Sequence, residues 1–210
     1  MALVSDADVK RLVIVEDEPE ILGLMKDFFL GAGYRVKGFA SAEELIADLD
    51  WIGSVDCVIA DVRLPGMDGL QLLRLIMGQR PATPVVIMTG HGDIPMAVKA
   101  IKDGAFDFIE KPFTPERLDE IVSDALASRR PVRVTQDARD AENALSRLTP
   151  RQIEIVDLIA EGLTSKEIAV RLGMSFRTVD THRARIMEKL QVNSLAELLR
   201  LRLAAELSGI

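Results

Sequence analysis

Cysteine and aromatic residues are scarce in this chain of 210 residues. It contains one cysteine, Cys57, one tryptophan, one tyrosine and two histidines, and aromatic residues make up 4% of the sequence. A single cysteine excludes an internal disulfide and a metal cluster held by cysteines. This scarcity of cysteine is typical of a protein that works in a reducing cytoplasm.

Long apolar runs are missing as well. No apolar stretch is long enough to span a bilayer, and the N-terminus lacks the basic segment and apolar core of a secretory signal. Hydrophobic residues make up 48% and charged residues 28% of the chain, which is ordinary for a globular protein. We therefore expect a cytoplasmic protein that makes no membrane contact.

A general excess of positive charge is also absent, since the net charge is -7. The charge is unevenly distributed. Residues 1–130 contain 14 Lys and Arg against 22 Asp and Glu, whereas residues 131–210 contain 12 against 11. An acidic first part joined to a nearly neutral second part predicts two domains with different partners.

Short apolar runs alternate with amphipathic stretches in the first part of the chain. The runs lie at residues 12–15, 34–39, 57–60, 85–88 and 106–109. They predict buried strands, and each is followed by apolar residues at helical spacing. Five strands that alternate with five helices predict an α/β fold, a doubly wound five-stranded parallel sheet.

Polar side chains follow the predicted strands at the points where four of them end. Asp61 comes directly after the third strand, and alone it fits a helix cap as well as a ligand site at the sheet edge. The other residues in such positions are Glu16, Asp17, Thr89 and Lys111. Because the carboxyl ends of parallel strands meet at one edge, we expect three carboxylates, a hydroxyl and an ammonium group to converge there.

This set of groups has a chemical use. Closely spaced carboxylates repel one another unless a cation joins them, and Mg²⁺ is a hard ion that accepts carboxylate oxygens. A metal ion together with Lys111 can neutralise the oxygens of a phosphoryl group in transfer, and Thr89 can donate a hydrogen bond to it. Asp61 is the candidate nucleophile. For any single residue the alternative is a cap or a solvated charge.

Residues 10–128 resemble the receiver domain of two-component response regulators. The resemblance is carried by residues 15–18, 60–69, 88–90 and 110–113. It implies a flavodoxin- or CheY-like strand order, 2-1-3-4-5. It also implies that Asp61 accepts a phosphoryl group from a histidine kinase, and that Mg²⁺ is bound by Asp17, Asp61 and the backbone carbonyl of Arg63, with Glu16 acting through a water.

The same resemblance implies how phosphorylation is signalled. Lys111 would pair with the phosphate and would precede Pro112 through a cis peptide bond. Thr89 would move toward the phosphate, and Phe108 would rotate into the space that Thr89 leaves. This would remodel the surface formed by the fourth helix, fifth strand and fifth helix. Residues 90–96 resemble the FixJ branch of the family in particular.

The segment from residue 129 to residue 147 is polar, with few apolar anchors, and predicts a partly helical linker. We therefore expect a receiver domain at 1–128, this linker, and a small all-α domain at 148–210. Cap signals predict four helices in the last domain. The N-caps expected for these helices are Thr149, Ser165, Ser175 and Ser194.

A helix, a turn at Gly173 and a second helix form the helix-turn-helix pattern, whose second helix enters the DNA major groove. Residues 165–190 contain six Lys and Arg against three Asp and Glu. Such cations predict phosphate contacts and a salt-dependent affinity for DNA. A small helical bundle with a solvated basic face is the alternative.

Residues 148–203 resemble the LuxR/NarL-type helix-turn-helix domain, through the segments 163–169 and 177–183. The resemblance implies that Val179 is a core residue and that Asp180, Thr181 and Ala184 face the groove. Asp180 departs from the Lys of many relatives, which affects affinity and target sequence. The DNA-binding set is completed by Lys166, Arg177, Thr178, His182, Arg183 and Lys189, whose basic members are phosphate contacts.

Together these features predict a phosphorylation-dependent transcription regulator of the FixJ/NarL type rather than a turnover enzyme. Its expected partners are a sensor histidine kinase, promoter double-stranded DNA, a second copy of the chain after phosphorylation, and RNA polymerase. Two alternatives stay open. One is a haloacid-dehalogenase-like phosphatase, which would normally need a second acid soon after Asp61 and a substrate-capping insertion. The other is an adaptor whose helical domain binds protein.

Overall fold

The computed structural model describes residues 9–48, 54–90, 94–127 and 134–206, with residues 134–139 described by their backbone alone. The chain divides into two compact units, of which the first comprises residues 1–91 and 103–129 and the second residues 92–102 and 130–210. The start of the predicted linker, residues 129–133, and part of the FixJ-like loop lie outside the described residues.

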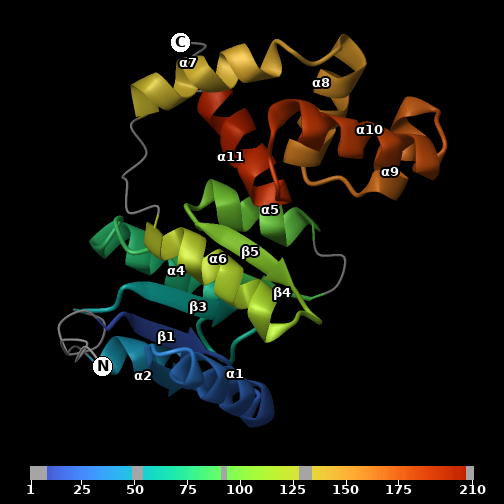
Figure 1. Cartoon of the computed structure of the whole chain (residues 1–210). Helices are drawn as coiled ribbons and strands as arrows, with labels where there is room; N and C mark the ends of the chain where they lie inside the picture. Colours follow the sequence, from blue (N-terminus) through green and yellow to red (C-terminus); the bar gives the residue numbers. More distant parts are fainter. Residues whose placement is uncertain (1–8, 49–53, 91–93, 128–133, 207–210) are drawn as a thin grey trace. The chain divides into compact units, whose positions relative to one another are not determined.

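Five parallel strands form the sheet of the first unit, in the order β2-β1-β3-β4-β5 (Figure 1). The strands are β1 Arg11–Val15, β2 Arg35–Phe39, β3 Cys57–Asp61, β4 Val85–Thr89 and β5 Asp107–Glu110. The chain passes from β1 out to β2 and then returns past β1 to β3, so right-handed crossovers place helices on both faces. The predicted doubly wound parallel sheet and its CheY-like strand order are confirmed.

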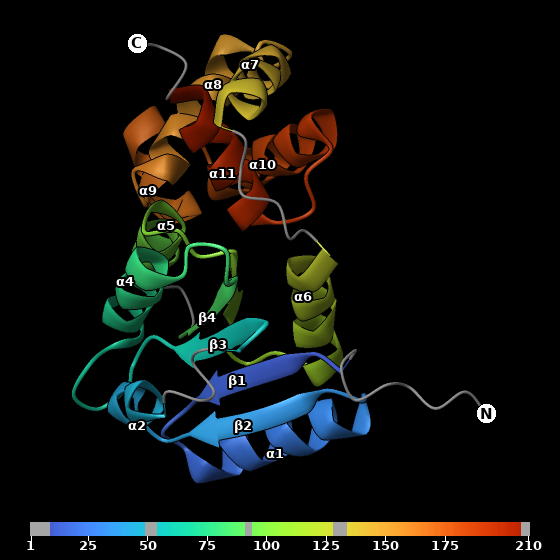
Figure 2. The same cartoon turned by 90° about the vertical axis from the view of Figure 1, so that its left-hand side faces the viewer.

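The helices between and after the strands are α1 Pro19–Gly31, α2 Ala42–Ala47, α4 Gly69–Gln79, α5 Ile94–Lys102 and α6 Pro115–Ala127. On one face of the sheet, α1 and α6 pack together over a core that includes Phe29, Ile59 and Leu118. Figure 2 shows α2 and α4 on the other side of the sheet. All residues of β3 and β4 are buried, as expected for strands covered on both faces.

Helices make up the rest of the described chain. They are α7 Val134–Leu145, α8 Pro150–Ala160, α9 Ser165–Leu172, α10 Phe176–Leu190 and α11 Leu195–Glu206. The helix α7 lies inside the segment that the sequence predicts to be a linker. The four helices after it match the predicted all-α domain and bury Ile155, Ile168, Val179 and Ile186 completely. No helix in the described ranges has the length and apolar character needed to cross a membrane.

The predicted N-cap of α9 is wrong by one residue. Thr164 is the N-cap, and its hydroxyl accepts a hydrogen bond from the backbone N–H of Glu167, whose side chain returns to the N–H of Thr164. Ser165 is instead the first residue of the helix and is buried. The physical reason is the residue three positions on. Glu167 can close a capping box with Thr164, whereas Ile168 offers Ser165 no such partner.

The start of α2 has only half of a capping box. Ser41 caps the helix, because its hydroxyl accepts the N–H of Glu44 at 3.2 Å. The carboxylate of Glu44 returns to the N–H of Ala40 rather than to that of Ser41. The predicted caps at Thr149, Ser175 and Ser194 are confirmed by hydrogen bonds to the N–H groups three residues further on.

Candidate functional site

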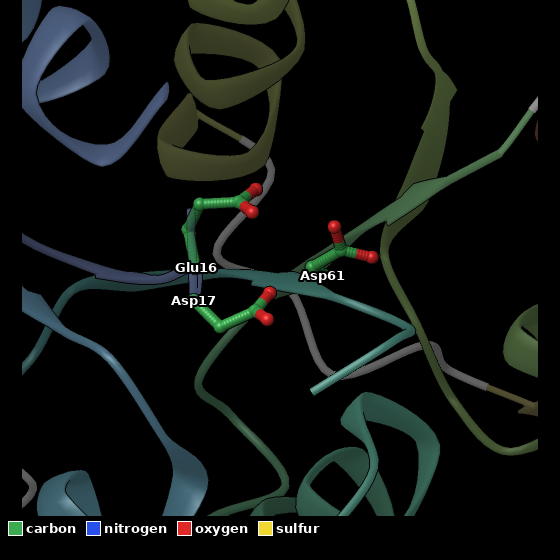
Figure 3. Close-up of side chains that lie close together, drawn as sticks. All are labelled: Glu16, Asp17 and Asp61. Atoms are coloured by element: carbon green, nitrogen blue, oxygen red, sulfur yellow. The ribbon is translucent and has the colours of Figure 1, made fainter. Parts of the chain in front are cut away.

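Three carboxylates lie together at the C-terminal ends of β1 and β3 (Figure 3). Glu16, Asp17 and Asp61 each offer an oxygen within 4.8 Å of the other two. Glu16 and Asp61 are buried, whereas Asp17 is exposed. The cluster follows from the register of the sheet, which pairs Val15 with Ala60 and so brings the residues beyond them to one level.

Lys111, which follows β5, reaches into this cluster. Its Nζ donates a hydrogen bond to Oε2 of Glu16 at 2.7 Å and another to Oδ2 of Asp61. Burial raises the pKa of Glu16, and the hydrogen bond from Lys111 opposes that rise. Burial alone would lower the pKa of Lys111, but its bonds to Asp61 and Glu16 outweigh this and raise it. The site thus holds a charged ammonium group against two buried carboxyl groups.

The alternative role of Asp61 as a helix cap is excluded by the start of α4. The N-cap of α4 is Asp68, which accepts the N–H of Gln71 at 2.7 Å and forms a capping box with it. Asp61 instead accepts the backbone N–H of Arg63 at 2.9 Å. Its carboxylate therefore lies at the sheet edge, where Oδ1 accepts the N–H of Arg63 and Oδ2 accepts a hydrogen bond from Lys111.

The donor set suits a hard divalent ion. Carboxylate oxygens are the ligands that Mg²⁺ prefers, and such an ion usually keeps several of its waters. Asp17 is exposed, so the carboxylate cluster opens to solvent at this residue and a hydrated ion has access. The exposed residue Arg63 is bonded through its N–H to Asp61, which puts its backbone at the edge of the cluster. The residues present therefore fit a magnesium site.

Thr89 and Phe108 lie on the neighbouring strands. Thr89 ends β4 and is 2% exposed, and its carbonyl accepts the N–H of Lys111 at 2.8 Å. Phe108, in β5, pairs in register with Ile87 and is half-buried. The structure therefore places Thr89 at the same sheet edge as Asp61 and Phe108 next to β4. The movement of the two side chains stays a prediction.

Two residues that the sequence did not single out shape the loop after Asp61. A Cβ atom at Gly69 would lie 2.0 Å from the backbone carbonyl oxygen of Asp61, so only glycine fits this approach. Glu43, from α2, accepts the N–H of Met67 at 2.8 Å. Backbone N–H groups, its own and that of Met67, lower the pKa of Glu43. The glycine at position 69, directly after the N-cap Asp68, could have been recognised from the sequence. The hydrogen bond of Glu43 could not, because its partner is 24 residues away.

The predicted DNA-binding residues lie on α9 and α10. Val179 is completely buried, as the resemblance implies. His182 and Arg183 are half-buried. The exposed members of the set are Lys166, Arg177, Thr178, Asp180, Thr181, Ala184 and Lys189.

Several of these residues have hydrogen-bond partners within the helical unit. The hydroxyl of Thr178 shares a hydrogen bond of 2.8 Å with that of Ser175 at the N-cap of α10. The hydroxyl of Thr181 donates to the carbonyl of Arg177 one turn earlier, at 2.9 Å. Nδ1 of His182 is buried and has no hydrogen-bond partner among the described residues. These bonds fix side-chain directions on the face that the resemblance assigns to DNA.

Two further hydrogen bonds join side chains of α10 to neighbouring helices, and their donors are residues predicted to contact phosphates. Arg183 donates to the hydroxyl of Ser165 at 2.6 Å, and Lys189 donates to Oε1 of Gln152 at 2.9 Å. Both acceptors are buried, with exposed fractions of 5% for Ser165 and 4% for Gln152. Neither bond has a local signal in the sequence, because the partners lie 18 and 37 residues apart.

Comparison with known proteins agrees with this geometry. Residues 12–123 match the family model of the response regulator receiver domain, and residues 146–202 match that of bacterial regulatory proteins of the luxR family. The chain is 36% identical to the transcriptional regulatory protein FixJ of Bradyrhizobium diazoefficiens, over 93% of this chain and 95% of the relative. It is 37% identical to the C4-dicarboxylate transport transcriptional regulatory protein DctR of Rhodobacter capsulatus, over 90% and 96%.

Solved structures give the same picture across both units. Full-length FixJ from B. japonicum is similar with a TM-score of 0.54 and 36% identity, covering 94% of this chain and 98% of that one. The response regulator StyR is similar with a TM-score of 0.53 and 35% identity, covering 92% and 98%. The likeness thus extends over the sheet and the helices that follow it.

Proposed function

Since the chain belongs to the response regulators that join a receiver domain to a LuxR-family DNA-binding domain, we propose that it is a phosphorylation-dependent transcription regulator whose phosphoryl acceptor is Asp61. The observation that carries this proposal is the edge of the sheet. There Asp61 lies beside Glu16 and Asp17 and is bonded to Lys111. The domains are a receiver at 1–128, a linker at 129–147 and a DNA-binding domain at 148–210.

The chemistry of the acceptor step follows from the groups around Asp61. A carboxylate oxygen of Asp61 attacks the phosphorus of a phosphohistidine on the partner kinase, and the P–N bond breaks as the new P–O bond forms. Lys111, freed from one carboxylate charge by the transfer, pairs with the phosphoryl oxygens. The hydroxyl of Thr89, at the end of the adjacent strand, donates to the same group.

Mg²⁺ is the cofactor that the carboxylate cluster would hold, through Glu16, Asp17, Asp61 and the carbonyl of Arg63. When bound, it supplies positive charge that offsets the negative charge of the phosphoryl group. Asp61 is modified once per activation and slowly loses the group, so the chain does not turn over a small substrate. The histidine kinase, promoter DNA, a second copy of the chain and RNA polymerase are its partners in the cytoplasm.

The DNA-binding half of the proposal rests on α10 and its charges. We assign phosphate contacts to the exposed cations Arg177 and Lys189, with Lys166 on α9, and base contacts to Asp180, Thr181 and Ala184. A single small domain offers a limited DNA interface, so two copies on paired half-sites are expected. Phosphorylation increases DNA affinity by favouring that dimer.

The test compares the full chain with its Asp61→Asn variant, each treated with an acyl phosphate and Mg²⁺. We expect the wild type to gain one phosphoryl group by mass, to dimerise in sedimentation, and to bind more tightly to a duplex selected from a random-sequence pool. The variant should do none of these. Equal dimerisation of the two proteins would refute the switch, and DNA binding that does not weaken with salt would favour a protein-binding adaptor.

A further inference from the structure

The helix α10 is tied to its two supporting helices through polar side chains. Arg183 is bonded to Ser165 at the start of α9, and Lys189 is bonded to Gln152 in the first turn of α8. Both acceptors are almost completely buried. A buried polar group without a partner is costly, so these bonds are part of how the helices fit together.

We propose that Ser165 and Arg183 form a clasp that fixes the rotation of α10 about its own axis, and that Arg183 is thereby a positioning residue for base recognition rather than a phosphate contact. The clasp is the pair Ser165 and Arg183. The inference rests on the proposed DNA-binding function and deepens it, because it concerns how the same helix presents its groove-facing residues.

The hydroxyl of Ser165 has no capping role that would explain it. Thr164 caps α9 and forms the capping box with Glu167. Ser165 is therefore a small polar residue in a buried position whose hydroxyl accepts one side-chain donor, at 2.6 Å. A guanidinium group presents its donors in a fixed plane, so a bond to it defines a direction and not only a distance.

Apolar packing alone leaves that direction loosely set. Val179 and Ile186 hold α10 in the core, and both are completely buried. Hydrophobic burial depends on area and has no preferred direction. Arg183 lies between them in sequence and directly before Ala184, so a bond at this position fixes the angle at which Asp180 and Ala184 leave the helix. With 3.6 residues per turn, a modest rotation would turn these side chains away from the groove.

The charge of Arg183 supplies the means to test this role. A cation that neutralises a DNA phosphate releases a counterion, so its loss lowers the slope of log affinity against log salt by about 0.9. A cation that only positions the helix leaves this slope unchanged. Lys166 is the matched control, because it is an exposed cation on the same first turn of α9 and one residue from Ser165.

The experiment measures binding of the acyl-phosphate-treated full chain to two duplexes, one selected by the wild type from a random-sequence pool and one with the same bases scrambled. We expect Ser165→Ala and Arg183→Gln each to lower the ratio of selected to scrambled affinity about tenfold. The double variant should lose no more than either single variant. Ser165→Ala and Arg183→Gln should leave the salt slope unchanged. Lys166→Gln should lower the slope and weaken binding to both duplexes by the same factor.

Arg183→Lys keeps the charge and removes the planar guanidinium, so it should lower the ratio of selected to scrambled affinity as much as Arg183→Gln does. This variant also covers the case in which Ser165→Ala fails to fold, which circular dichroism would reveal. The proposal is overturned by a wild-type ratio in Arg183→Lys, or by a salt slope that falls in Arg183→Gln as it does in Lys166→Gln. A wild type that selects no duplex would refute the proposed function itself.

Discussion

Gly69 sets how closely α4 approaches the end of β3. Its N–H donates to the carbonyl of Val62 at 3.0 Å, and a Cβ atom there would lie 2.0 Å from the carbonyl oxygen of Asp61. We therefore expect Gly69→Ala to lower the free energy of unfolding by about 1–3 kcal/mol, because backbone must shift to admit the methyl group. The same shift moves Asp61, so phosphorylation by an acyl phosphate should slow.

Gly78 provides the matched control on the same helix. A Cβ atom at Gly78 would meet no heavy atom within 4 Å. Since alanine is the better helix former, Gly78→Ala should raise stability, by at most about 1 kcal/mol. Urea unfolding and phosphorylation rates measure both effects. If Gly69→Ala and Gly78→Ala changed the free energy of unfolding and the phosphorylation rate equally, the close approach at Gly69 would not contribute to stability.

Cys57 is completely buried in β3, and burial, with a smaller effect of Asp56, raises the pKa of its thiol from 9.0 to about 12. The thiolate is the reactive form, so iodoacetamide should leave the native chain unmodified at neutral pH and modify it once urea unfolds it. The protonated thiol stabilises the fold fully below pH 9.0, and this contribution is lost as the pH rises through about 12. Mass spectrometry measures the modification, and equal rates in both states would contradict the expected burial.

The residues of the acidic site could be predicted because each lies within two residues of the end of an apolar run. Glu16, Asp61 and Thr89 take their places from the strands before them, and the parallel register does the rest. The bonds between them could not be predicted in the same way. That Lys111 contacts two carboxylates at once depends on side-chain directions at the strand ends, which a pattern of residue types does not encode.

At the scale of elements, apolar periodicity located the strands and helices, whereas the helix ends depended on single hydrogen bonds. The start of α9 shows the difference. Thr164 and Ser165 are both good N-caps, and the sequence prediction chose Ser165 although Glu167 stands three residues after Thr164. The capping-box spacing favoured Thr164, and the structure has this arrangement. The burial of Ser165 depends on α10 and has no local signal.

The capping box of α9 gives a prediction about pH. The backbone N–H of Thr164 and then its hydroxyl lower the pKa of Glu167 from the ordinary value of 4.5. A carboxyl group with a lowered pKa stabilises the fold above its unfolded pKa, and the contribution is lost as the pH falls through the folded pKa. The wild type should therefore lose more stability below pH 4.5 than Glu167→Gln, which keeps an acceptor but does not titrate.

Urea unfolding of the two proteins at a series of pH values, monitored by the circular dichroism of their helices, measures the difference in stability. Carboxyl NMR of the wild type gives the Glu167 titration directly. A midpoint at or above 4.5 would contradict the hydrogen bonds that define this helix start.

At the scale of the whole molecule, the uneven distribution of charge along the chain corresponds to two parts with different sites. The acidic first part contains the carboxylate site, and the nearly neutral second part has six of its 12 Lys and Arg residues on α9 and α10. Each part also has its own apolar core. Leu12, Ile59 and Leu118 are buried within the sheet unit, whereas Ile155, Ile168 and Ile186 are buried among the helices. Separate cores allow the two activities to be disturbed one at a time.

Ile186→Ala tests this separation. Ile186 is completely buried in α10, and removing a buried isoleucine side chain costs about 2–5 kcal/mol. The helical domain is small, so such a loss takes much of its stability and should abolish binding to the selected duplex. Phosphorylation of Asp61 by an acyl phosphate should continue at the wild-type rate, because the residues that place Asp61 belong to the other core. Phe29→Ala, in the sheet core, should slow phosphorylation and leave the helical domain folded. A slower phosphorylation rate in Ile186→Ala would show instead that the two cores share their stability.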